Sequence, residues 1–181
     1  MSVTGRPNLR RRVNEIAFRQ AGYFAAAQAR SAGFSYQAQK CHVDRGNWDR
    51  VDRAFFRLPE WPSDADDAFA RWSVWSACTG VVSHESAAAV HDFGELDPNY
   101  IHLTVPNTMR KNSSGVVLHR APLTSSEIES RPTFRVTTAL RTILDLATSD
   151  ITQEQLNSVV ADATTRNEVT EIALHRTMDD F

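Results

Sequence analysis

The fold of this chain is decided by residues 23–58, YFAAAQARSAGFSYQAQKCHVDRGNWDRVDRAFFRL. The alanine-rich part over 24–32 favours a helix, because alanine has the highest helix propensity. Gly33 follows at once, where a helix can end in the left-handed conformation. Ser35 is placed to cap a second helix that runs to about Arg45, and Gly46 is placed to close it. The pattern predicts a helix-turn-helix.

A rotation of 100° per residue sets the expected faces of the second helix. The positions expected to point inward are Phe34, Ala38, Cys41 and Arg45. The positions expected on the outer face are Ser35, Tyr36, Gln39, Lys40 and Val43. The polar members of that outer face carry donors and acceptors that suit base edges in the major groove of DNA.

The segment after the second helix combines strand-forming residues with cations. The strand-forming residues are Trp48, Val51, Phe55 and Phe56. The cations are Arg50, Arg53 and Arg57. This composition predicts a two-stranded basic hairpin, a wing that touches phosphates.

A helix over residues 9–20 is expected before this stretch, with Asn8 as its cap. Arg10, Arg11 and Arg12 flank its apolar stripe and are expected to contact the DNA backbone. The alternative interpretation is a solvated charged face, which is the usual fate of a charge run.

The second half of the chain reads as α+β, mostly helical with a small β-sheet. The segment PEWPS at 59–63 has the prolines of a junction, so the expected domains are 1–60, a winged helix-turn-helix, and 61–181. Strands are expected at 101–105, 116–119 and 134–137, the first two as antiparallel neighbours. Helices are expected over 64–77, from Ser83 onward, and over 139–147, 152–166 and 168–178.

Charge is distributed unevenly along the chain. Residues 1–57 carry 11 Lys or Arg and 4 Asp or Glu, a net of +7, whereas residues 58–181 carry a net of −9. Such asymmetry predicts a polyanion partner for the first half. The alternative is two ordinary domains with unequal surfaces.

Neither a membrane nor an oxidising compartment is indicated. Cys41 and Cys78 lack Cys-x-x-Cys spacing and are expected to be buried free thiols. No apolar run approaches the ~20 residues needed to span a membrane. We expect a cytoplasmic protein.

Catalytic chemistry is not indicated by the residue patterns. His84-Glu85 with His91 has the spacing His-Glu-x5-His, which does not place two histidines on one helix face as in zinc proteases. We expect helix-start and hydrogen-bonding roles for these residues, with no metal and no cofactor. Neither Lys40 nor Lys111 has an acidic residue two positions before it, as a Glu-x-Lys nuclease pattern requires. We therefore expect no enzyme.

The order of these signals resembles the AbiEi antitoxins of type IV toxin–antitoxin systems and related transcriptional regulators. The resemblance covers about residues 10–165 and rests on GYFAAAQA (22–29), RVDRAFFRL (50–58), VSHESAA (82–88), PNYIHLTVP (98–106) and VTTALRTILDLA (136–147). It implies a winged-helix DNA-binding domain, a C-terminal antitoxin domain, repression of the protein's own operon, and neutralisation of a nucleotidyltransferase-like toxin. The chain departs from the family at Ala54, where a wing glycine is usual, and at the small residues Ala38 and Cys41.

Together these signals predict a sequence-specific DNA-binding antitoxin and autorepressor that binds double-stranded DNA at repeated sites in its own promoter. The residues expected to contact DNA are Arg10, Arg11, Arg12, Ser35, Tyr36, Gln39, Lys40, Arg50, Arg53 and Arg57. Two alternatives stay open. One is a plain winged-helix regulator without a toxin partner. The other is a module that binds the toxin directly through the acidic half.

Overall fold

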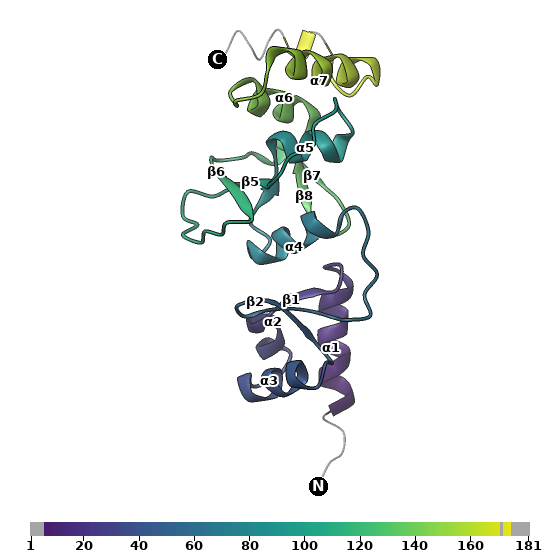
Figure 1. Ribbon diagram of the computed structural model, residues 1–181, viewed down its shortest axis with the longest axis vertical. Coiled ribbons are helices and arrows are strands. Elements are labelled where there is room, and N and C mark those ends of the chain that lie inside the picture. Colours follow the sequence, from purple (N-terminus) through teal and green to yellow (C-terminus); the bar gives the residue numbers. More distant parts are fainter. Residues whose placement is uncertain (1–5, 171, 175–181) are drawn as a thin grey trace. The chain divides into compact units, whose positions relative to one another are not determined.

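The computed structural model describes residues 6–170 and 172–174 and has a mixed α+β fold, as expected (Figure 1). The chain divides into two compact units, residues 1–78 (unit 1) and 79–181 (unit 2). The expected boundary at residue 60 is therefore wrong, because the helix that follows the proline segment packs within unit 1.

Unit 1 consists of helices and a three-stranded antiparallel sheet in the order β1-β3-β2. Its elements are α1 (Arg6–Phe18), β1 (Tyr23–Ala25), α2 (Ala26–Ser31), α3 (Tyr36–Asp44), β2 (Asp49–Asp52), β3 (Phe55–Arg57) and α4 (Asp67–Trp75). The helix expected over 24–32 starts later than predicted, at Ala26. Residues 23–25 instead pair with β3, so strand pairing overrides the helix propensity of this segment.

Side-chain alternation gives the small sheet two apolar faces. Phe24 and Phe56 are paired across β1 and β3 and enter a core with Val13 of α1 and Trp48. Tyr23 and Phe55 point to the other face and pack with α4 through Ala70 and Val74. Because the second face needs α4 to cover it, unit 1 extends beyond the prolines.

Unit 2 contains a five-stranded mixed sheet in the order β6-β5-β4-β8-β7. Its strands are β4 (Val81–Val82), β5 (Ile101–Val105), β6 (Val116–Arg120), β7 (Ile128–Ser130) and β8 (Arg135–Thr137). β5 and β6 were expected to be antiparallel, but they are parallel, with Ile101 opposite Val116 and Val105 opposite Arg120. The long polar segment between them therefore crosses over instead of forming a hairpin.

The helices of unit 2 are α5 (His84–His91), α6 (Ala139–Ala147) and α7 (Gln153–Thr165), with a short 3-10 helix η1 (Ser125–Glu127). α6 packs between α5 and α7, and buried Ala88, Ile143 and Val159 join these helices in one core. The predicted helices over 139–147 and 152–166 are confirmed within one residue at each end. Of the helix expected over 168–178, residues 171 and 175–178 lie outside the described residues.

Two further expectations concern the cysteines and membrane-spanning segments. Cys41 is only half-buried and Cys78 is exposed, so the expected burial of both cysteines is wrong. Within 6–170 and 172–174, the structure has no helix that is both long and apolar enough to cross a membrane.

The turn between β2 and β3 is strained at Ala54, which has a φ of +57°. An L-residue in this left-handed conformation costs roughly 1–2 kcal/mol that glycine avoids. We expect Ala54→Gly to raise the free energy of unfolding by about 1 kcal/mol in urea denaturation. The matched control is Ala27→Gly on the exposed side of α2, which should lower that free energy by about 1 kcal/mol. Destabilisation by Ala54→Gly would contradict the assigned turn.

Candidate nucleic-acid interface

The turn between α2 and α3 forms as the sequence predicts. Gly33 ends α2 with a φ of +110°, and the amide of Phe34 donates to the carbonyl of Ala29. Ser35 caps α3, its hydroxyl oxygen accepting from the amide of Ala38 at 3.2 Å. Ser35 is thus tied to the helix start, where it fixes the direction in which α3 leaves the turn.

The outward face of α3 carries Tyr36, Gln37 and Lys40, all exposed. Tyr36 is 64% exposed, and the guanidinium of Arg30 lies 4.8 Å from its ring and donates to its hydroxyl at 3.1 Å. Lys40 pairs with Asp44 at 2.6 Å, but both side chains are more than half exposed, so the pair contributes little and separates easily. These side chains can reach a ligand without disturbing the core.

Gln39 is a correction to the predicted contact set. Its side chain is buried, and its amide donates to the carbonyls of Ala26 and Phe34 at 3.1 Å each. Gln39 therefore locks α3 against the start of α2 and is not available to a base edge. The expected inward face was rotated, since His42 and Val43 also pack inward while Cys41 is only half-buried.

The hairpin presents Arg50 and Arg53 to solvent, as predicted. β2 and β3 pair antiparallel with a bulge between Arg50 and Asp52. The carbonyl of Ala54 accepts from the amide of Ala26 at 2.8 Å, which anchors the hairpin turn to the first residue of α2. The hairpin and the two helices therefore share one rigid frame.

Arg57 is the second correction. Its guanidinium donates to Asp67 of α4 at 2.7 Å and to Ser63 at 3.2 Å, and it lies over the ring of Tyr23. The Tyr23 hydroxyl also donates to Asp67, at 2.9 Å, and burial, together with that hydrogen bond, raises the pKa of Tyr23 to about 12. Arg57 therefore fastens α4 to the sheet and is not free to hold a phosphate.

Arg10, Arg11 and Arg12 are all exposed along α1. Arg11 pairs with Glu15 at 3.4 Å, one turn away on the same helix. The side chain of Arg10 makes no hydrogen bond or ion pair with any residue that the structure describes. The three arginines add positive charge to α1, which packs against α2.

The revised boundary weakens the charge asymmetry without reversing it. Unit 1 has 12 Lys or Arg and 8 Asp or Glu, a net of +4, and unit 2 has a net of −6. The acidic residues added to unit 1 follow the hairpin, and one of them, Asp67, is already paired with Arg57. Sequence reasoning also missed Arg30, which only the fold brings next to Tyr36.

A second polar cluster gathers histidines in unit 2. The ring of His84 stacks on that of His119 with centroids 3.4 Å apart, and His102 Nδ1 lies 3.1 Å from His119 Nε2 and 2.8 Å from Glu85. Burial, aided by neighbouring positive groups, lowers the pKa of both His84 and His119 to about 4. Face-to-face stacking leaves these two rings poorly placed to share a metal. Among the described residues no group of His, Cys, Asp and Glu has metal-binding geometry.

Arg141 of α6 closes the cluster on its other side. It donates to Asp145, one turn away at 2.7 Å, and pairs with Glu127 of η1. The pair of Arg141 and Asp145 joins adjacent turns of α6. His84 has a φ of +53°, so the first residue of α5 is held in a left-handed conformation by this network.

Comparison with known proteins gives a likeness of fold to solved structures. No protein-family model matches the chain, and no curated protein matches it. The structure is similar to the crystal structure of the RV2827C protein from Mycobacterium tuberculosis, with a TM-score of 0.62 and 13% sequence identity over 96% of this chain and 72% of that one. At this identity the likeness concerns the fold alone.

The neutral histidines predict a loss of stability in acid. The pKa values of His84 and His119 are about 4 in the folded chain, against 6.5 for a histidine exposed to water. Between these values the unfolded state binds more protons, so the free energy of unfolding falls as the pH drops from about 6.5 towards 4. Urea midpoints measured at pH 7 and pH 5 should show this decrease.

Substitution of either histidine should flatten this pH dependence. In His84→Asn the new residue tolerates the positive φ, and His119→Gln keeps a polar side chain on β6. An unchanged difference between the pH 7 and pH 5 midpoints in both variants would contradict the assignment.

Proposed function

We propose that this protein is a sequence-specific DNA-binding antitoxin and autorepressor, and that residues 1–57 act as a winged helix-turn-helix. The observation that carries the proposal is the element order α1-β1-α2-α3-β2-β3, with exposed polar and cationic side chains on α3 and on the hairpin. In such a domain the second helix of the turn enters the major groove and the hairpin lies along the backbone.

The groups proposed for each role follow from their exposure. Tyr36, Gln37 and Lys40 of α3 face base edges, with Arg30 holding Tyr36 in place. Arg50 and Arg53 contact phosphates from the hairpin, and the exposed arginines of α1 add backbone contacts. Gln39 and Arg57 act as structural residues in this scheme.

The antitoxin role rests on the resemblance of the ordered stretches to the AbiEi family. It assigns to the protein a toxin of the nucleotidyltransferase class, encoded beside it.

The net charge of −6 on unit 2 favours a second candidate role, direct capture of that toxin through an acidic surface. Co-purification of the toxin with the full chain, lost at high salt, is the expected result for capture. Rescue of growth without any complex would favour indirect neutralisation.

Removing the proposed contacts should weaken DNA binding in a salt-dependent way. Each phosphate contact adds about 0.9 to the slope of log affinity against log salt concentration, so loss of the phosphate contact of Arg53 should lower that slope by about 1. Loss of the base contact of Lys40 should weaken binding by a further ~1–3 kcal/mol. The measurement is a titration of the DNA upstream of the protein's own gene with the variant Lys40→Ala/Arg53→Ala, at several salt concentrations.

The matched control for this titration is Arg110→Ala/Lys111→Ala, which removes the same charge from an exposed loop of unit 2. This control should bind the upstream DNA as the unmodified protein does. Equal loss of affinity in both double variants would mean that net charge, and not the α3 and hairpin surface, governs binding.

A further inference from the structure

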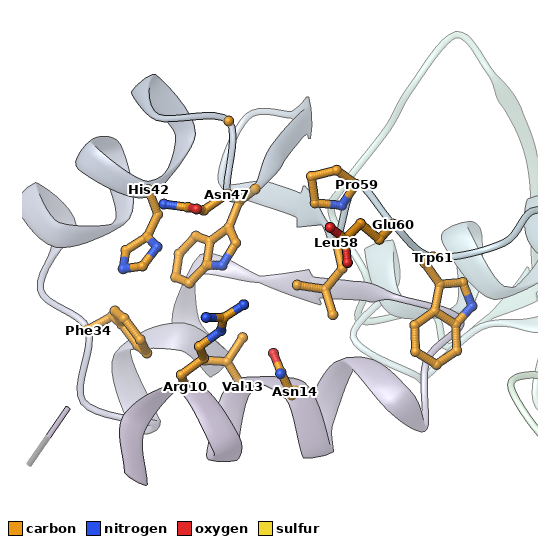
Figure 2. Close-up of a pocket in the computed structure, with 12 residues that line it drawn as sticks. Arg10, Val13, Asn14, Phe34, His42, Asn47, Leu58, Pro59, Glu60 and Trp61 are labelled. Carbon is orange, nitrogen blue, oxygen red and sulfur yellow. The ribbon is translucent and has the colours of Figure 1, made fainter. Parts of the chain in front are cut away.

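A groove of about 440 Å³ opens in unit 1 beside α1. Figure 2 shows Arg10, Val13 and Asn14 rising from α1 on one side and Leu58, Pro59 and Glu60 lying opposite. Phe34 and His42 stand at one end of the groove and Trp61 at the other (Figure 2). Its volume is within the range of sites for small organic molecules.

The floor of the groove rests on buried apolar and aromatic side chains, while polar atoms make up the larger part of its accessible surface. Val13, Phe34 and Trp48 are buried members of the main core of unit 1, so this surface is rigid. Leu58 and Trp61 are partly exposed and continue the apolar surface toward the other end. A flat hydrocarbon ring would bury one face against Leu58 and Trp61 and displace water there.

The rim of the groove carries polar side chains without protein partners. Arg10, Asn14, Asn47 and Glu60 are exposed, and their side chains make no hydrogen bond or ion pair within the described part of the chain. The contrast with Arg11 is informative, because Arg11 pairs with Glu15 at i+4 whereas the residue at i+4 from Arg10 is the neutral Asn14. The guanidinium of Arg10 therefore stays available at the mouth of the groove.

The chemistry of these groups selects a ligand class. A guanidinium binds a carboxylate through two parallel hydrogen bonds, and amides such as those of Asn14 and Asn47 fix a planar group by accepting and donating. Burial lowers the pKa of His42, and the nearby cations Arg45 and Arg10 lower it further, so this end of the groove is electropositive. Glu60 on the opposite rim repels a second acidic group on the same ligand.

We propose that this groove binds a small planar aromatic monocarboxylate, with its ring against Leu58 and Trp61 and its carboxylate on Arg10. The site involves no residue of α3 or the hairpin strands that is proposed to read DNA. Its test needs no DNA, so a failure of the proposed function leaves it unaffected.

The experiment compares 2-naphthoate with its neutral analogue 2-naphthamide by calorimetry on the full chain. We expect 2-naphthoate to bind at least tenfold more tightly than the amide, because only the carboxylate pairs with Arg10. In Arg10→Gln this preference should disappear, while Arg12→Gln, which removes the same charge from a neighbouring position of α1 outside the groove, should keep it.

Amide chemical shifts identify the place of binding in the same samples. Changes should concentrate at residues 10–14, 46–48 and 58–61, and the free spectra of both variants should match that of the unmodified chain elsewhere. Absence of 2-naphthoate binding, equal affinity for the two ligands, or an undiminished preference in Arg10→Gln would each overturn the proposal. Shift changes spread over both units would overturn it as well, since they indicate adhesion without a site.

Discussion

The contacts of Trp48 hold together the parts of unit 1 that carry the proposed DNA-binding surface. Its ring stacks on His42 of α3 at 4.6 Å and meets Phe24 of β1, Phe34 of the turn and Phe56 of β3. This one buried side chain thus holds α3, β1 and the hairpin strand β3 in fixed positions relative to one another. Aromatic packing of this kind provides large buried area with few rotamers, so the exposed faces of α3 and of the hairpin keep a defined spacing.

That frame explains why some cations are free and others are not. Arg53 is exposed in the hairpin turn, and Arg50 is exposed although it lies over the ring of Phe56. Arg57 instead lies on the face that α4 covers and pairs with Asp67. On α1, Arg10 faces the groove and is also one of the cations proposed for DNA. A carboxylate bound in the groove would neutralise one phosphate contact, which links the two proposed sites through a single side chain.

Most helices and strands could be predicted from the sequence, but the way they pack together could not. Ser35 and Gly33 predicted both ends of the turn, because caps are local chemistry. The inward face of α3 was misplaced, since Ala38 and Cys41 gave no strong apolar period and Gln39 is buried only because two carbonyls of other segments accept its amide. The prolines at 59 and 62 mark a bend in the chain, but not the end of packing. Long-range topology, which no local pattern encodes, makes β5 and β6 parallel. It also brings together the side chains of His84, His102 and His119.

The central claim is that α3 and the hairpin of unit 1 form one surface for duplex DNA. The most direct test is a backbone amide chemical-shift titration of the full chain with the duplex upstream of its own gene, in low salt. The account predicts saturable changes confined to residues 30–40 and 50–54 and the exposed side of α1, with unit 2 unchanged. Shift changes that fall mainly in residues 79–165, or none at a DNA concentration equal to that of the protein, would contradict it.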